Sequence, residues 1–167
     1  MLTRPVLPVL AAAAIILSGC ATLPTGAAEG SASRTYSDSR ASIWQRVLSS
    51  SARNSMFVRQ ADMENGLVAV DREIVPSEPV QLFEDSIFSW ADCGSRGLTG
   101  RVVRQRVQLN YVIRPEADGR TTVTLNARFQ ELRNSTPAKK PEWIDCKSTG
   151  MLERDMLEAI YYDHPAA

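Results

Sequence analysis

The sequence is poor in the side chains that most often perform catalysis. Histidine occurs only once, as His164. The chain contains no HExxH zinc motif, no glycine-rich phosphate loop and no aspartate-rich calcium loop. A serine or cysteine nucleophile therefore lacks a histidine base in any recognisable arrangement. These absences argue against an enzyme, and we expect a protein that uses no cofactor and no metal.

Excess charge of either sign is also lacking. The chain carries 19 basic and 19 acidic residues. Nucleic-acid binding depends on clustered positive charge, so nucleic acid is not an expected partner. The acidic pairs Glu84-Asp85 and Asp62/Glu64 are candidates for acid–base chemistry, but carboxylates that lie next to each other or in turns are usually solvated. We therefore predict no catalytic residue.

No apolar run is long enough to cross a bilayer, which takes about 20 residues. The stretch from Pro5 to Leu17 is shorter, follows Arg4 and is interrupted by Pro8. A basic residue, a short apolar segment and small residues before a cysteine are typical of an export signal. Two other interpretations of this segment are an uncleaved membrane anchor and a plain secretory signal.

The end of this segment, Leu17-Ser18-Gly19-Cys20, resembles the lipobox of bacterial lipoproteins. The resemblance implies that residues 1–19 form a signal peptide and that Cys20 carries a diacylglyceryl thioether and an N-acyl chain. Two or more acyl chains hold a protein stably on a membrane. The residue after the cysteine is Ala21 rather than aspartate, which in this family favours the outer membrane. We expect a lipid-anchored protein that faces the periplasm.

Once Cys20 is acylated, two cysteines remain, Cys93 and Cys146. An even pair in an oxidising compartment predicts a disulfide. A metal or redox pair is the alternative, but the two lie far apart and form no CxxC motif. The stretch from Trp90 to Leu98 is similar to the stretch from Trp143 to Met151. We interpret these stretches as two similar turns that meet at the disulfide, each packing a tryptophan beside it.

The remaining chain has the length of a single domain. Residues 20–36 form the acylated cysteine and a flexible tether rich in small and polar residues. Residues 37–162 form one α+β domain, and residues 163–167 a tail. A helix is expected from Ser37 or Asp38 to Arg53-Asn54, because four apolar residues lie on one of its faces: Ile43, Trp44, Val47 and Leu48.

Alternating residues predict two antiparallel hairpins. Residues 56–60 and 67–71 flank Asn65-Gly66, a strong turn signal. Residues 106–113 and 122–129 alternate apolar and polar residues around an Asp118-Gly119 turn. A final helix is expected from Ser148–Gly150 onward. The fold class is therefore α+β, with an antiparallel sheet of about four strands covered on one face by an N-terminal and a C-terminal helix.

The tether, the aromatic-bearing helix and the hairpin that closes at Asn65-Gly66 resemble the helix-grip and related two-layer domains of small envelope lipoproteins, including those of BamC. The resemblance covers about half of the domain and includes no diagnostic motif. The two Trp-x-Asp-Cys elements depart from it. It implies a class of fold rather than a shared activity.

Two surfaces are candidates for binding. Lysine occurs only three times, and Arg101, Arg104 and Arg106 gather at the start of one predicted strand. Guanidinium groups suit phosphate or carboxylate, as in anionic lipid, lipopolysaccharide or an acidic protein. The alternative is a solvated sheet face with Arg–Glu pairs between strands.

The second candidate is the segment 76–100, where Phe83, Phe88 and Trp90 lie among residues without regular patterning. It either caps the core or exposes an apolar patch for a partner or ligand. We expect an accessory or adaptor lipoprotein that binds an envelope protein or another envelope component. A carrier that holds an apolar or lipid ligand between sheet and helices is the alternative.

Overall fold

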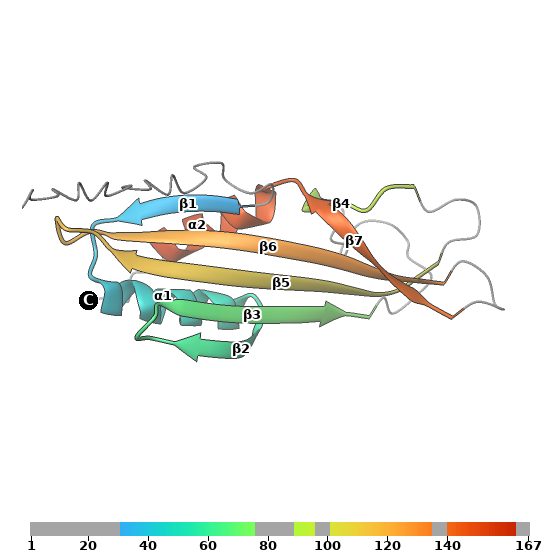
Figure 1. Ribbon diagram of the computed structural model, residues 1–167, viewed down its shortest axis with the longest axis horizontal. Coiled ribbons are helices and arrows are strands. Elements are labelled where there is room, and N and C mark those ends of the chain that lie inside the picture. Colours follow the sequence, from blue (N-terminus) through green and yellow to red (C-terminus); the bar gives the residue numbers. More distant parts are fainter. Residues whose placement is uncertain (1–30, 76–88, 96–100, 135–139, 163–167) are drawn as a thin grey trace, which may run out of the picture.

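A computed structural model of the chain describes residues 31–75, 89–95, 101–134 and 140–162. These residues form an α+β fold of antiparallel strands and two helices (Figure 1). The elements, in chain order, are β1 (Ser31–Tyr36), α1 (Arg40–Arg53), β2 (Phe57–Asp62), β3 (Leu67–Ile74), β4 (Ala91–Asp92), β5 (Arg101–Pro115), β6 (Thr121–Asn134), β7 (Glu142–Ser148) and α2 (Met151–Tyr162). In these ranges, no helix is long and apolar enough to cross a membrane.

The strands form one sheet in the order β2-β3-β5-β6-β7-β4, and β1 also pairs with β6. Strand β1 pairs with Thr121–Asn126 of β6, whereas β7 pairs with Phe129–Arg133. The two strands therefore share one edge of β6, and they lie one after the other along it in Figure 1. The described residues hold seven strands, so the expected number of about four is too low.

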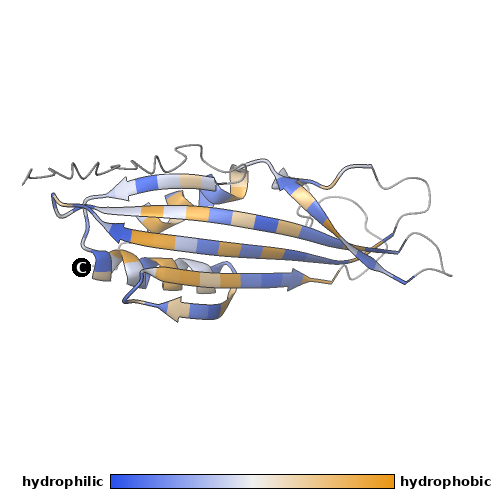
Figure 2. Ribbon diagram, in the orientation of Figure 1, coloured by the Kyte–Doolittle hydropathy of each residue, from blue (hydrophilic) through white to orange (hydrophobic). Residues whose placement is uncertain are grey.

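The long β5–β6 hairpin confirms the alternation expected from the sequence. Val107, Leu109, Tyr111 and Ile113 of β5 are all buried, while the residues between them remain partly or fully exposed. Val123, Leu125 and Phe129 of β6 are buried on the same face. The bands of alternating hydropathy along both strands are visible in Figure 2. This face of the hairpin forms the centre of the hydrophobic core.

Helix α1 begins one or two residues later than expected. Its N-cap is Ser39, whose hydroxyl accepts a hydrogen bond from the Ser42 amide at 3.4 Å. Asp38 instead receives a bidentate ion pair from Arg46, with the shorter contact at 2.7 Å, so its carboxylate is not available as the cap. The apolar face of the helix is as expected, since Ile43, Trp44 and Val47 are buried.

Helix α2 begins just after Gly150 and buries Leu152, Met156, Leu157 and Ile160, as its periodicity predicts. Both helices lie behind the sheet in the view of Figure 1, and their buried side chains belong to the same core as those of the strands. The Tyr36 hydroxyl of β1 donates to the Leu157 carbonyl of α2 at 2.6 Å. This bond ties the first strand to the last helix.

The expected tether extends too far into the domain. Residues 31–36 form β1 rather than a flexible linker, and only residues 20–30 of the predicted tether lie outside the described part. The strand has one fully buried residue, Tyr36, and is held by its pairing with β6. Its hydroxyls add two cross-strand hydrogen bonds, one between Ser33 and Thr124 and one between Thr35 and Thr122, each 2.8 Å long.

The turn between β2 and β3 requires glycine. Four residues, 63–66, join the strands, and Gly66 adopts a φ of +67°, where side chains are strained. Its carbonyl accepts a hydrogen bond from the Ile113 amide at 2.8 Å, and a Cβ at this position would lie 2.2 Å from the Ile113 carbonyl oxygen. The turn is therefore pressed directly against the backbone of β5.

We predict that Gly66→Ala costs far more stability than Gly119→Ala. Gly119 also has a positive φ, +83°, but no atom lies within 4 Å of the Cβ position. Gly119→Ala should lower the free energy of unfolding by about 1 kcal/mol from backbone strain. Gly66→Ala should lower it by about 3 kcal/mol, because the β5 backbone must also shift. Urea unfolding of both variants checks this, and equal losses would contradict it.

Candidate functional site

The candidate site residues divide between described and undescribed parts of the chain. Cys20, Phe83 and Phe88 lie outside the described residues, as do residues 76–88 and 96–100 of the expected loop. Trp90, Cys93 and Cys146 lie together where β4 meets β7. Arg101, Arg104 and Arg106 lie on β5. The structure therefore places a disulfide region and an arginine-bearing strand.

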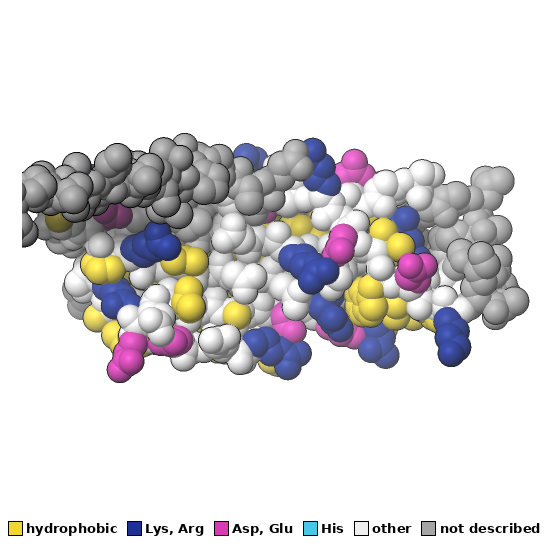
Figure 3. Space-filling model, in the orientation of Figure 1, with side chains coloured by type: hydrophobic (Ala, Val, Ile, Leu, Met, Phe, Trp, Pro, Cys, Tyr) yellow, Lys and Arg dark blue, Asp and Glu magenta, His cyan; other side chains and the backbone are white. Residues whose placement is uncertain are grey.

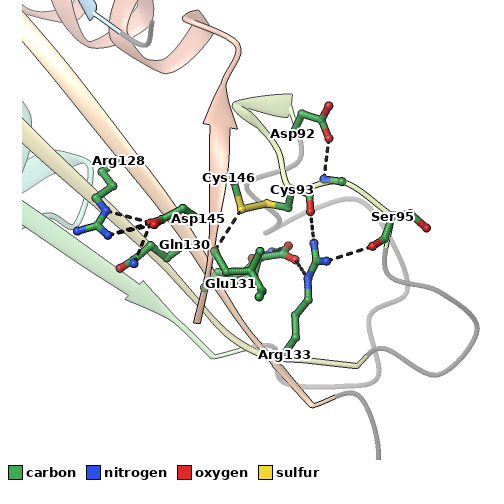
Figure 4. The surroundings of a disulfide bond; sticks show 12 residues. Asp92, Cys93, Ser95, Arg128, Gln130, Glu131, Arg133, Asp145 and Cys146 are labelled. Carbon is green, nitrogen blue, oxygen red and sulfur yellow. Dashed lines mark hydrogen bonds and ion pairs between the residues drawn. A yellow bond between two sulfur atoms is a disulfide. The ribbon is translucent and has the colours of Figure 1, made fainter. Parts of the chain in front are cut away.

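Cys93 and Cys146 form a disulfide with an S–S distance of 2.04 Å (Figure 4). Ala91 and Asp92 of β4 pair with Ser148 and Lys147 of β7, so the disulfide continues the same antiparallel register by one residue. The two similar sequence elements therefore meet as paired strands, not as turns. Both elements are extended, and each cysteine then lies directly opposite its disulfide partner on the neighbouring strand.

The two tryptophans of these elements occupy different environments. Trp90 packs partly buried against the core, and its carbonyl accepts hydrogen bonds from the Thr149 amide at 2.9 Å and the Thr149 hydroxyl at 3.0 Å. Trp143 lies under the guanidinium of Arg106, 4.4 Å from the ring centroid. Of the two tryptophans, Trp90 therefore has the capping position that the sequence analysis allowed, and Trp143 belongs to the arginine-bearing face.

A buried polar network supports the disulfide from the sheet. Glu131 of β6 is fully buried and accepts hydrogen bonds from Gln105 at 3.1 Å and from Arg133 at 2.9 Å. Arg133 also donates to the carbonyls of Cys93 and Ser95 (Figure 4). A buried carboxylate needs such partners, because an unpaired charge in the interior is costly. The network fixes the chain that follows β4 to β6.

On the opposite face, Glu73 of β3 joins two of the predicted arginines. Arg104 contacts it at 2.8 Å and Arg106 at 3.2 Å. The hydrogen bond from Arg106, followed by that from Arg104, holds the pKa of the Glu73 carboxyl below its usual value. Arg101 is exposed at the start of the strand. Two of the three predicted arginines thus form the cross-strand pairs of the alternative interpretation.

A second ion pair continues this face toward β7. Arg128 contacts Asp145 through two nitrogens, and Gln130 donates to the same carboxylate at 3.0 Å. The charged groups on this side of the sheet are visible in Figure 3, and Figure 4 shows the contacts of Asp145. Such exposed pairs stabilise weakly and leave guanidinium edges in contact with solvent. The face can therefore still bind an anionic or polar partner.

The sequence analysis did not predict the buried polar network of Gln105, Glu131 and Arg133. It also did not single out the side chains that lie between the Glu73 and Asp145 ion pairs on the opposite face. Glu131 and Gln105 lie in register with buried apolar residues of the same strands, so extending the alternation would have predicted their burial. Among the described residues, no group of three or more His, Cys, Asp and Glu side chains is placed to hold a metal.

The disulfide should contribute strongly to stability. It closes a loop with a sequence separation of 53 residues. On the chain-entropy model such a loop stabilises the fold by about 4 kcal/mol. Replacing both cysteines by alanine should lower the free energy of unfolding by about this amount, as measured by urea unfolding. Adding a reductant should destabilise the unmodified chain and leave the double variant unaffected, and an equal response of both proteins would contradict the prediction.

The Glu73 ion pairs should make stability depend on pH in the acidic range. Because the folded-state pKa is lowered, the contribution of this carboxylate is complete above its unfolded value of about 4.3 and is lost as the pH falls through the folded value. Glu73→Gln should therefore reduce the free energy of unfolding by about 0.5 kcal/mol at pH 7 and by less near pH 3. Asp155→Asn, at an exposed carboxylate of α2, is the control. A Glu73→Gln effect that is the same at both pH values would refute the assignment.

Comparison with known proteins assigns no family to the chain. No protein-family model matches the chain. No curated protein matches it either. Among solved structures, the chain is similar to a DUF4468 family protein from Bacteroides ovatus, with 15% sequence identity and a TM-score of 0.36. The match covers 72% of this chain and 63% of that protein, so the chain spans less than two thirds of the length of the protein that it matches.

Proposed function

We propose that the chain is a lipid-anchored accessory or adaptor protein of the bacterial outer membrane that faces the periplasm. The observation that carries this proposal is the tetrapeptide Leu17-Ser18-Gly19-Cys20 after a short apolar segment. The disulfide between Cys93 and Cys146 is compatible with an oxidising envelope compartment. The protein acts by binding an envelope protein or another envelope component, and it performs no chemistry on it.

In this proposal the two helices cover one face of the sheet and the other face makes the contacts. The helix side is occupied by a continuous apolar cluster in which Trp44, Phe129 and Ile160 are at most 5% exposed. This packing favours an adaptor over a carrier with a ligand between sheet and helices. Phe57 lies outside this cluster and is 68% exposed at the edge strand β2.

The length of the tether sets how far this surface can lie from the membrane. Ten residues, 21–30, separate Cys20 from the first residue of β1. Even fully extended, a chain of ten residues spans at most about 35 Å. The domain is therefore held close to the lipid headgroups. Its partner must then lie in the same membrane or in the periplasm next to that membrane.

Replacing the proposed acylation site should release the protein. Cys20→Ala removes the thiol on which the proposed diacylglyceryl thioether forms, so the variant should leave the membrane fraction on cell fractionation. A second variant, Ala21→Asp, should keep the protein on membranes but shift it from the outer membrane to the inner membrane. Ala28→Asp, in the same tether, should leave the distribution unchanged. A Cys20→Ala protein that stays with the outer membrane would refute the anchor.

A further inference from the structure

Two exposed tyrosines lie at the end of α2, next to the first strand of the fold. Tyr161 is 46% exposed and Tyr162 is 71% exposed, and their rings meet edge to face with centroids 5.2 Å apart. The guanidinium of Arg34 in β1 lies over the Tyr161 ring, 4.7 Å from its centroid. We call Arg34, Tyr161 and Tyr162 the β1–α2 patch. It combines a cation with aromatic rings that carry polar hydroxyls, all at least partly exposed.

The patch lies where the tether joins the domain. Three residue steps along an extended strand, about 10 Å, separate Ser31 from Arg34. The Tyr36 hydroxyl donates to the Leu157 carbonyl of α2, so the strand and the helix are held together here. In Figure 1, α2 lies behind β1 and β6. The chain that leads back to Cys20 therefore enters the domain beside the two tyrosines.

The contacts of Arg34 differ from those of the arginines on the polar sheet face. Arg104, Arg106 and Arg128 each pair with a carboxylate. Arg34 instead contacts the rings of Tyr36 and Tyr161, and no carboxylate of the described residues forms an ion pair with it. A guanidinium can stack on aromatic rings and still present its N–H donors to a phosphate. Arg34 is therefore suited to bind an external phosphate.

We propose that the β1–α2 patch lies in the phospholipid headgroup layer of the membrane that carries the anchor. The inference deepens the proposed function and rests on it, because the acylated Cys20 holds this part of the domain next to the membrane. Ten residues, at most about 35 Å of chain, join Cys20 to Ser31. Tyrosine is enriched at membrane–water interfaces, where its ring contacts apolar groups and its hydroxyl contacts water. The guanidinium of Arg34 binds the lipid phosphate.

The charges around the patch favour lipid headgroups over a polyanion. The exposed charged residues of α2 are Arg154, Asp155 and Glu158. Together with Arg34 they make two positive and two negative charges, so the surface has no positive excess that would attract a nucleic acid or a strongly acidic protein. A phosphatidylethanolamine headgroup carries both a phosphate and an ammonium group. It can therefore pair with Arg34 and with the two carboxylates at once.

A second group of exposed apolar side chains provides an internal comparison. Phe57 of β2 is 68% exposed, nearly as much as Tyr162. It lies on the edge strand β2, whereas β1 pairs with β6, beyond β3 and β5. Neighbouring strands are about 4.8 Å apart, so roughly 19 Å separates β2 from β1. A membrane that contacts the domain at the β1–α2 patch should leave Phe57 in water.

The test is photocrosslinking of the full-length protein in vesicles of phosphatidylethanolamine and phosphatidylglycerol. The photoreactive amino acid p-benzoylphenylalanine replaces Tyr162 in one protein and Phe57 in a second protein, which is the matched control. Irradiation should attach phospholipid at position 162 at least about tenfold more often than at position 57. The mass of the modified peptide measures this ratio.

Replacing Arg34 should weaken the contact. Arg34→Gln should lower lipid crosslinking at position 162 about fivefold, the effect of one arginine next to an anionic membrane surface. Arg59→Gln, at a more exposed arginine of β2, is the control and should leave the crosslinking unchanged. The urea midpoint checks that each variant is folded. Tyr161→Ser, at a half-exposed ring, is a second variant that should also lower the crosslinking.

Three outcomes would overturn the proposal. Equal lipid crosslinking at positions 162 and 57 would show that the domain has no preferred membrane-facing edge. Unchanged crosslinking in folded Arg34→Gln and Tyr161→Ser proteins would show that the patch does not make the contact. Capture of a second copy of the chain at position 162 in place of lipid would assign the patch to self-association.

The lipid anchor and the membrane contact can fail separately, because the mass of the peptide that contains Cys20 reports acylation independently. Lipid capture at position 162 by a protein whose Cys20 carries no acyl group would refute the anchor and leave the membrane contact standing. An acylated Cys20 without lipid capture at position 162 would do the reverse.

Discussion

The pairing of β5 with β6 is the constraint on which the other elements depend. Their register runs from Arg101 opposite Asn134 to Pro115 opposite Thr121, and β3, β1 and β7 all attach to these two strands. Because side chains alternate across a strand, this register decides at once which residues enter the core and which form the polar face. The disulfide and its polar network lie toward one end of the same hairpin, around Phe129 and Glu131. A slip of one residue would bury Asn110 and Arg128 and expose Leu109 and Phe129.

The two faces of the hairpin are organised by different physics. The helix side gains its stability from apolar burial, which is non-directional and tolerates only a few well-bonded polar groups such as Glu131. The other side is held by directional contacts between charges and hydroxyls that remain in water and stabilise weakly. Contacts of that second kind can be exchanged for contacts with a partner at small cost. We therefore base the proposal for partner recognition on the polar face.

The sequence predicts the parts of the fold that carry a strong periodic signal. Val107 to Ile113 alternates so regularly that its hairpin could be assigned, and the apolar faces of both helices follow from their spacing. Strand β1 was missed because Ser31–Tyr36 has one fully buried residue and takes its place only through pairing with β6, which no local pattern encodes. The start of the helix was expected too early because aspartate is a residue type that favours the N-cap position. The carboxylate of Asp38 instead forms an ion pair with Arg46, which the local sequence does not reveal. Of the candidate site, the cysteine pair and the arginine–glutamate contacts could be anticipated, whereas the contact of Arg106 with Trp143 could not, since β5 and β7 are distant in the sequence and are not joined by one turn.

Strand β1 gives the molecule a mechanical property. It is the first described element of the chain, and it is joined to the rest by its ladder with β6 and by the Tyr36 hydroxyl that bonds to α2. Any pull that travels along the residues before Ser31 must therefore reach the domain through this short ladder. Because Tyr36 is part of the hydrophobic core, the end of this ladder is also anchored in the core. A load on this part of the chain is therefore shared between the β1–β6 ladder and the apolar core.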